Sequence, residues 1–161
     1  MLSHFATSKH ASMDEDKIIQ KVKANIRSLR GKQVMLDYEV ADIYGVETKR
    51  LNEQVKRNAA KFPEDFRFQL NKEEWEDLKS HFATSSDWGG RRTIPYAFTE
   101  HGVLQAANVL NSTFANSISV FVIRAFVEMR SLTELQKGIK DRKAALEQQP
   151  ASEKKLSRFL Q

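Results

Sequence analysis

The sequence of 161 residues contains no cysteine. This absence excludes disulfide bonds, thiolate zinc sites, iron–sulfur clusters and cysteine nucleophiles. No stretch approaches the roughly 18 consecutive apolar residues that a membrane-spanning helix needs, and residues 1–12 lack the apolar run of a signal peptide. We therefore expect a soluble, cytoplasmic protein, whose length suits a single domain with tails.

Several enzyme motifs are absent as well. The sequence has neither the phosphate-binding loop GxxxxGK[ST] nor the nucleophile elbow GxSxG. Its 4 histidines do not follow the spacing of metal ligands. Acidic residues cluster within 72–79, which leaves a metal-dependent nuclease as an alternative, but Lys72 and Lys79 flank them as on a solvated helix face. We expect no enzyme, no cofactor and no metal site.

Positive charge is present in excess. The 26 Lys and Arg residues outnumber 21 Asp and Glu residues for a net charge of +5, and the pI is about 9.5. This balance favours an anionic partner, nucleic acid first and a membrane surface second. The excess lies in four stretches: +6 in 17–32 (six basic, no acidic), +3 in 47–62 (five against two), +2 in 79–98 (three against one) and +4 in 137–161 (seven against three).

Periodicity divides the chain into four segments. Residues 1–16 are polar and predict a mobile N-terminal tail. Residues 17–112 mix helical spacing with short alternating runs, which predicts an α+β domain with a few short strands. Residues 113–136 predict a long helix that packs on the core or pairs two copies, because its apolar residues recur every four and three positions. Residues 137–161 are charged and predict a tail or frayed helix.

Within residues 17–112 the predicted elements alternate. A first helix begins at Lys17 and ends at Gly31, and Asp37 is a suitable N-cap for a second helix. Pro95 interrupts the last strand, which predicts a position at the edge of the sheet. The other predicted strands are 33–36 and 66–70, and the other helices are 48–58, 72–79 and 99–110.

Residues 37–55 match the pattern of a helix-turn-helix. Ala41 is the small residue where two helices cross, and Gly45 follows four positions later at the turn. Leu51 stands ten positions after Ala41, on the second helix. Any two helices joined by a glycine turn share part of this pattern, so a plain helical hairpin remains an alternative.

The second of these helices has a polar face, because Leu51 and Val55 point inward. Lys and Arg bind guanine edges or phosphates, and Asn can pair with adenine through two hydrogen bonds. We expect this face to enter the major groove of DNA. Its residues are Thr48, Lys49, Arg50, Asn52, Glu53, Lys56 and Arg57.

A second basic cluster occupies residues 86–93. Two glycines permit a tight turn, and Arg91 and Arg92 suit phosphate or minor-groove contacts beside the ring of Trp88. We interpret the cluster as a basic wing whose DNA-binding residues are Trp88, Arg91 and Arg92. The alternative is a surface hairpin with incidental arginines.

One hexapeptide occurs twice. Residues 3–8 and 80–85 share the letters SHFATS. A single pair does not define a repeat architecture. The pair is either a duplication remnant without a role or a sign that the N-terminal segment can take the place of the internal one.

Several motifs, in order, resemble one family. They are RGKQVMLD at 30–37, the run from Ala41 to Asn58, FPEDF at 62–66, ATSS and WGGR within 83–91, and PYAFTE with GV within 95–103. Over residues 26–111 the sequence is similar to the KilA-N-type DNA-binding domain of phages and prophages, in the subgroup named after the N-terminal part of phage open reading frame six.

The resemblance implies a small α+β domain that is winged-helix-like and binds DNA in transcription regulation or antirepression. Relatives often carry a separate C-terminal module, whereas only the long helix and the charged tail follow here, so the activity of such a module is not implied. We expect a phage or prophage regulator that binds double-stranded DNA, associates with the nucleoid when bound, and forms a homodimer through 113–136. The alternative is an antirepressor that binds a phage or host regulator without touching DNA.

Overall fold

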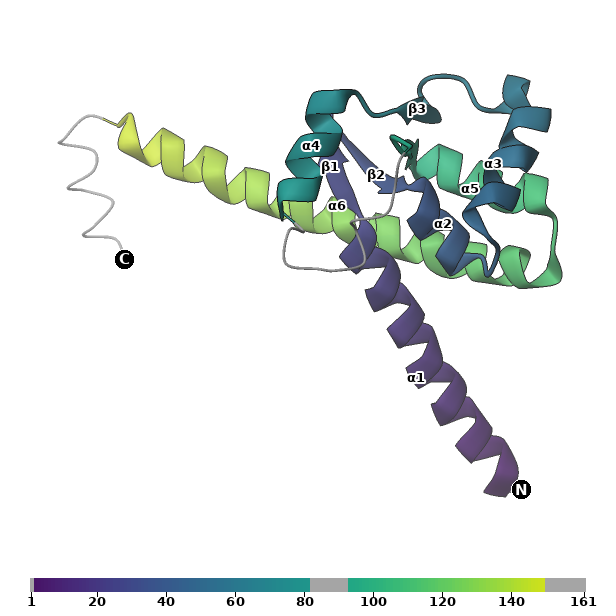
Figure 1. Ribbon diagram of the computed structural model, residues 1–161. Coiled ribbons are helices and arrows are strands. Elements are labelled where there is room, and N and C mark those ends of the chain that lie inside the picture. The colour runs from purple at the N-terminus through teal and green to yellow at the C-terminus, as the bar shows by residue number, and fades with distance from the viewer. Residues whose placement is uncertain (1, 82–92, 150–161) are drawn as a thin grey trace. The chain divides into compact units, whose positions relative to one another are not determined.

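The computed structural model describes residues 2–81 and 93–149, with side chains from Asp14 onward. The chain forms two compact units, Met1–Phe126 and Val127–Gln161. In chain order (Figure 1) the elements are α1 (Leu2–Asn25), β1 (Arg27–Leu29), β2 (Lys32–Leu36), α2 (Asp37–Ile43), α3 (Thr48–Arg57), the 3-10 turn η1 (Ala59–Lys61), β3 (Arg67–Gln69), α4 (Lys72–His81), β4 (Tyr96–Thr99), α5 (Glu100–Leu110) and α6 (Thr113–Glu147). The α+β class expected from the sequence is confirmed.

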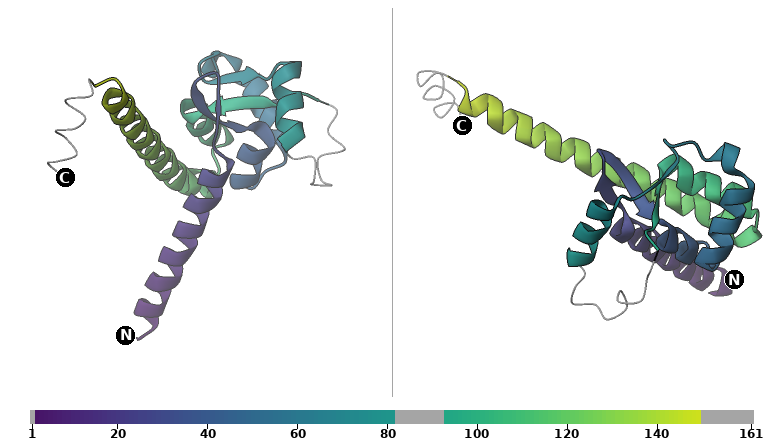
Figure 2. Two further views of the ribbon diagram at one scale, coloured as in Figure 1. Left: turned by 90° about the vertical axis from the view of Figure 1, so that its left-hand side faces the viewer. Right: turned by 45° about the horizontal axis from the view of Figure 1, so that its top comes forward.

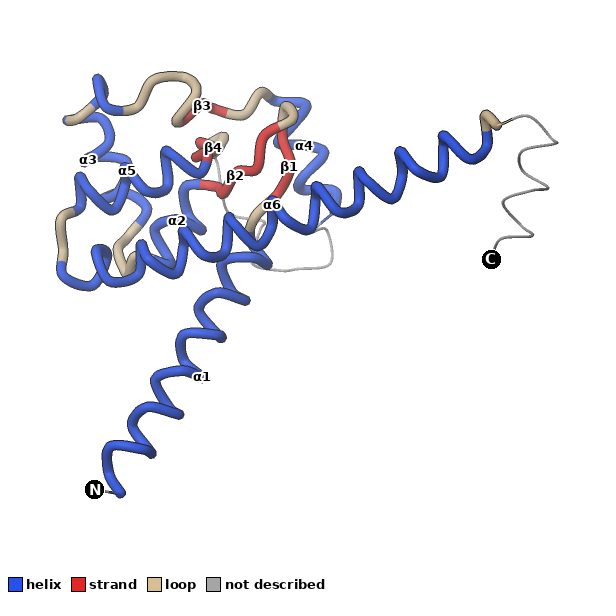
Figure 3. The backbone as a smooth tube through the Cα atoms, turned by 180° about the vertical axis from the view of Figure 1, so that it is seen from behind, coloured by secondary structure: helices blue, strands red, loops and turns tan. Residues whose placement is uncertain are grey.

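The strands form one antiparallel sheet in the order β1-β2-β4-β3, drawn in red in Figure 3. Side chains alternate between its two faces, as the period of two in a strand requires. Met35 pairs with Phe98 across β2 and β4, and both join the cluster under the helices. Leu36 and Ala97 join the opposite cluster, which Trp75 of α4 completes. The sheet therefore separates α4 from α5 (Figure 2).

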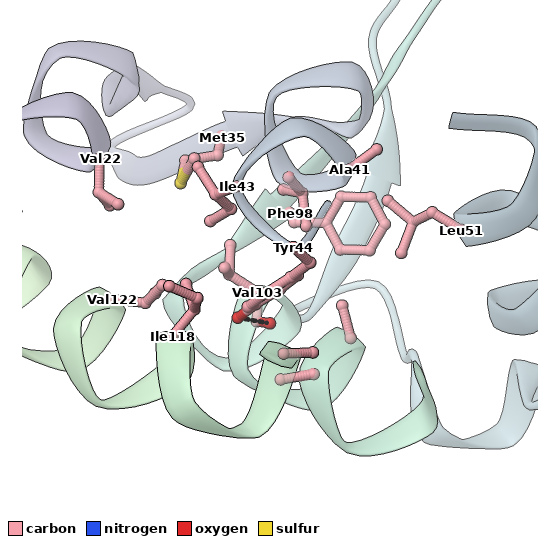
Figure 4. Close-up of a cluster of buried hydrophobic side chains, with 14 of the residues drawn as sticks. Val22, Met35, Ala41, Ile43, Tyr44, Leu51, Phe98, Val103, Ile118 and Val122 are labelled. Atoms are coloured by element: carbon pink, nitrogen blue, oxygen red, sulfur yellow. Dashed lines mark hydrogen bonds between the residues drawn. The ribbon is translucent and has the colours of Figure 1, made fainter. Parts of the chain in front are cut away.

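The larger core lies on the face of the sheet that α5 covers. Figure 4 shows side chains from α1, β4, α5 and α6 converging on it, with Tyr44 at the centre. The Tyr44 hydroxyl donates a hydrogen bond of 2.8 Å to the Val103 carbonyl. Burial raises the pKa of Tyr44 well above its usual range, so the phenol stays neutral.

Helix starts agree with local capping chemistry. Thr99 Oγ1 accepts from the Gly102 amide at 3.5 Å at the start of α5. Before α4, Asn71 Oδ1 accepts from the Glu74 amide at 2.8 Å and the Glu74 carboxylate accepts from the Asn71 amide at 2.9 Å. This reciprocal pair is a capping box, and it satisfies two amides that a helix start leaves unpaired.

The N-terminal end of the chain differs from the prediction. Residues 2–16, which we expected to form a mobile tail, belong to α1. At the other end, α6 continues past residue 136 to Glu147, which is the helical alternative of the two predicted for this segment. The α1 segment contains no Gly or Pro, and Lys, Glu, Ala and Leu dominate 137–147. Such residues favour helix even where polar composition suggests a tail. No helix in the described ranges is long and apolar enough to cross a membrane.

The first helix ends earlier in the structure than the sequence pattern predicts. It stops at Asn25, and β1 then turns into β2 through Arg30 and Gly31, whose φ values are 53° and 73°. Two consecutive positive φ angles are the requirement of the tight hairpin turn that matches strand twist. Ile26 and Leu29 continue the helical spacing of the apolar residues before them, so periodicity alone does not predict β1.

Two finer predictions are also wrong. The last strand is an inner strand, because β4 begins at Tyr96, one residue after Pro95, and pairs on both sides. A proline just before a strand removes no ladder hydrogen bond. Asp37 is the first residue of α2 rather than its N-cap, a position that Leu36 occupies.

Gly102 is required by a close backbone approach. A Cβ at this position would lie 1.9 Å from the Phe66 carbonyl oxygen, whereas a Cβ at Gly138 would meet nothing within 4 Å. We expect Gly102→Ala to lower the free energy of unfolding by about 1–3 kcal/mol and Gly138→Ala to raise helix stability by up to about 1 kcal/mol. Urea denaturation measures both. A Gly102→Ala midpoint equal to wild type would contradict the packing.

Candidate nucleic-acid interface

Helices α2 and α3 form a compact helix-turn-helix. Ala41 is buried under the second helix, and Leu51 and Val55 of α3 are fully buried beside it. The Val46 amide donates to the Ala41 carbonyl at 3.0 Å, which closes the turn. Gly45 takes a φ of +66°, the left-handed conformation that glycine adopts without strain. The predicted roles of these residues in packing and in the turn are confirmed.

Burial of Leu51 and Val55 determines which side of α3 faces outward. Five of the seven predicted contact residues on this helix are exposed, and Thr48 and Asn52 are half-buried. The exposed residues are Lys49, Arg50, Glu53, Lys56 and Arg57. They form a cationic face with one acidic residue.

The cations of α3 differ from those that precede them in the chain. In the +6 stretch, Lys21 pairs with Asp42 at 2.8 Å, Arg30 pairs with Glu74 at 2.9 Å, and Arg27 pairs with Glu39. Within the parts of the chain that the structure describes, no ion pair joins the cations of α3 to an acidic side chain. Their charge is available to an external anion.

The half-buried Asn52 is bonded inward. Its side-chain amide donates to Asp37 Oδ2 at 3.2 Å. Its Oδ1 is shielded from solvent and has no hydrogen-bond partner among the residues that the structure describes. Asp37 also accepts from the backbone amides of Tyr38 at 2.8 Å and Tyr96 at 3.4 Å.

Arg67 of β3 interacts electrostatically with Asp37. The Arg67 guanidinium lies 4.1 Å from the centre of the Tyr96 ring. Burial lowers the pKa of Arg67, while the charge of the Asp37 carboxylate acts in the opposite direction. An open pocket of about 270 Å³ lies beside these residues, lined by Asp37, Thr48, Lys49, Asn52, Thr93, Ile94 and Tyr96.

The acidic residues of α4 do not assemble a metal site. Glu74 accepts two hydrogen bonds from Arg30, which lowers the pKa of its carboxyl, and Glu76 pairs with Lys79 at 3.0 Å. Among the residues that the structure describes, no group of three His, Asp or Glu side chains could hold a metal ion. The nuclease alternative gains no support from this helix.

The predicted wing cannot be placed. Trp88, Arg91 and Arg92 lie outside the described residues, as does most of the second SHFATS copy. The first copy falls in α1, in a part whose side chains are also outside the description. Their proposed roles stay predictions.

Sequence reasoning missed the polar group beneath α3. Asp37 follows the apolar run from Val34 to Leu36, and the sequence pattern predicts for it only the N-cap of a helix. An acidic residue next to an apolar run is a signal of a buried polar cluster, because a buried carboxylate requires several hydrogen-bond donors. Arg67 and Tyr96 could not be linked to it before the order of the strands was known.

Comparison with known protein families gives a match. The model of the ORF6N domain, a family named for the N-terminal domain of phage ORF6, matches residues 14–109. Comparisons with curated proteins and with solved structures gave no match. The matched residues include α2, α3 and every strand.

The hydroxyl of Tyr44 provides a test of the packing that supports the interface. Tyr44→Phe removes the buried hydrogen bond from the hydroxyl to the Val103 carbonyl, and we expect a loss of about 1 kcal/mol in unfolding free energy. Tyr96→Phe serves as the control, since it keeps the ring beneath Arg67. In thermal denaturation, the melting temperature should be lower than that of the wild type for Tyr44→Phe only. Equal melting temperatures for both variants would contradict a stabilising role of the hydrogen bond.

Proposed function

The chain belongs to the ORF6N domain family, and from this premise we propose that it is a phage-type regulator that binds double-stranded DNA sequence-specifically. The supporting observation is the outward face of α3, whose cations are exposed and carry no ion pair within the described part of the chain. Phosphates supply most of the binding free energy of such proteins, so unpaired cations on one helix face suit a DNA ligand. Membership of the wider KilA-N group is part of the proposal.

In this proposal α3 lies in the major groove. Lys49, Arg50 and Glu53 stand within one helical turn and can reach base edges, while Lys56 and Arg57 at the end of the helix bind phosphates. Arg91 and Arg92 bind the backbone or minor groove from a wing. Thr93 and Ile94 line the pocket beside Thr48, so the chain returns from the proposed wing next to the first turn of α3.

A homodimer through α6 is a further part of the proposal, with its contact moved from 113–136, where Ile118 and Val122 are buried in the core, to residues 132–146. Leu132, Ile139 and Leu146 recur every seven residues and are 46%, 61% and 50% exposed. This spacing is that of a coiled-coil seam. Arg142 and Glu147 are five positions apart, the offset at which flanking charges attract between two parallel copies. A second copy of the chain is therefore the partner that we propose for this seam.

The second candidate function uses the same helix differently. Val120 and Ile123 are 45% and 43% exposed and form a separate apolar stripe one turn long on α6. An exposed apolar stripe suits a protein partner. An antirepressor would bind a phage or host regulator there without DNA. Both candidates place the protein in the cytoplasm, and neither involves catalysis.

Charge variants test DNA binding. We expect Lys56→Ala to lower affinity for all duplexes and to reduce the salt slope by about 1. Arg50→Ala should instead change sequence preference by about 1–3 kcal/mol. Lys72→Ala is the matched control, because it removes one exposed cation from α4, on the other side of the sheet. Fluorescence anisotropy at several salt concentrations measures all three.

The same series separates the two candidate functions. Wild-type protein without salt-dependent binding to any duplex would contradict the DNA-binding proposal, and a regulator recovered through the Val120 stripe would then favour the antirepressor. Equal losses for Lys56→Ala and Lys72→Ala would contradict the assignment of α3 while keeping a general role for positive charge.

Light scattering tests the homodimer. We expect the wild type to have twice the mass of one chain, and Ile139→Glu to be a monomer because it places charges in the seam. Lys137→Glu changes charge outside the seam and should remain a dimer. A monomeric wild type at tens of micromolar would refute the seam as a stable self-association surface.

A further inference from the structure

We propose that Asn52 is a positioning residue, although it lies on the proposed DNA-binding helix. Its hydrogen bond to the buried Asp37 fixes the orientation of α3, and sequence is read by Lys49, Arg50 and Glu53. This inference rests on the proposed function and assigns a different role to one residue that the sequence pattern had placed among the base contacts.

The geometry of Asn52 disfavours base reading. Two-point recognition of adenine uses both the oxygen and the nitrogen of the amide. Here the nitrogen donates to Asp37 at 3.2 Å, and the oxygen is shielded from solvent. Reaching a base would break the first contact and turn the side chain out of the protein.

Asp37 is a strong anchor for this contact. The residue is 1% exposed and joins three elements, because its carboxylate accepts from Tyr38 in α2, from Asn52 in α3 and from the Tyr96 amide in β4. A buried carboxylate costs several kcal/mol unless donors surround it. Displacing α3 would remove one of these donors and leave the buried carboxylate less well hydrogen-bonded. The free-energy cost of that loss opposes movement of the helix.

Within residues 2–81 and 93–149, no side-chain hydrogen bond other than the one from Asn52 to Asp37 ties α3 to a neighbouring element. Leu51 and Val55 bury the helix, but apolar packing is non-directional. Burial of Leu51 and Val55 sets which side of α3 faces outward, and this hydrogen bond restrains the smaller rotation about the helix axis that apolar packing permits. Lys49 and Glu53 stand three residues before and one residue after Asn52, so that rotation sets where they point.

The test compares DNA motifs selected from a random duplex pool. We expect Asn52→Ala and Asp37→Asn to weaken preference at every position that α3 reads, reducing the ratio of specific to non-specific affinity about fivefold to tenfold. Non-specific affinity should change less than twofold, which a merely unfolded fraction would not produce. The exchanged pair Asp37→Asn with Asn52→Asp keeps one donor and one acceptor and should recover part of the ratio. Gln54→Ala, a half-buried amide on the same helix, is the matched control.

Two outcomes would overturn the inference. If Asn52→Ala loses preference at a single adenine while Asp37→Asn selects the wild-type motif, Asn52 reads a base. If the α3 amides exchange hydrogen at wild-type rates in both variants, the bond does not hold the helix.

Hydrogen exchange also separates this inference from the proposed function. A wild type that selects no motif contradicts DNA reading. Faster exchange in α3 of both variants, with no further increase when Asp37→Asn is combined with Asn52→Ala, would still support positioning by Asp37. Normal exchange together with a selected wild-type motif would leave the proposed function intact and remove the positioning role.

Discussion

The inward packing of α3 is the constraint on which the interface depends. Leu51 and Val55 are both fully buried, and they are one helical turn apart. Burying them leaves Lys49, Arg50 and Lys56 no orientation other than outward. Gly45 makes the arrangement possible, because only a left-handed turn returns the chain over Ala41. The cationic face is thus a consequence of the core rather than an independent surface feature.

Net charge gave an incomplete account of this face. The stretch with the largest excess, residues 17–32, commits Lys21, Arg27 and Arg30 to acidic partners within the fold. Internal pairing neutralises those charges locally, whereas α3 carries a smaller excess that remains available to phosphates. The position of each charge, and not its count, distinguishes a structural ion pair from a candidate contact.

Local signals predicted the helices well and the sheet less well. A short apolar run predicted β2, alternating apolar residues predicted β3, and the predicted helices 72–79 and 99–110 begin within one residue of α4 and α5. Strand order depends on pairings between distant residues, so the sequence did not predict the inner position of β4. The short β1 was missed because Ile26 and Leu29 keep helical spacing. The outward residues of α3 followed from periodicity, but the buried Asp37 beneath them did not, because Tyr96 comes 59 residues later in the chain.

The central claim is that α3 binds DNA through its outward face. Isotope-labelled protein titrated with a duplex tests it most directly, by following amide chemical shifts. The account predicts the largest changes in Thr48–Arg57, reversed by added salt, with α4 and the β1–β2 hairpin unaffected. Changes confined to α6, or absent from every amide at low salt, would contradict it.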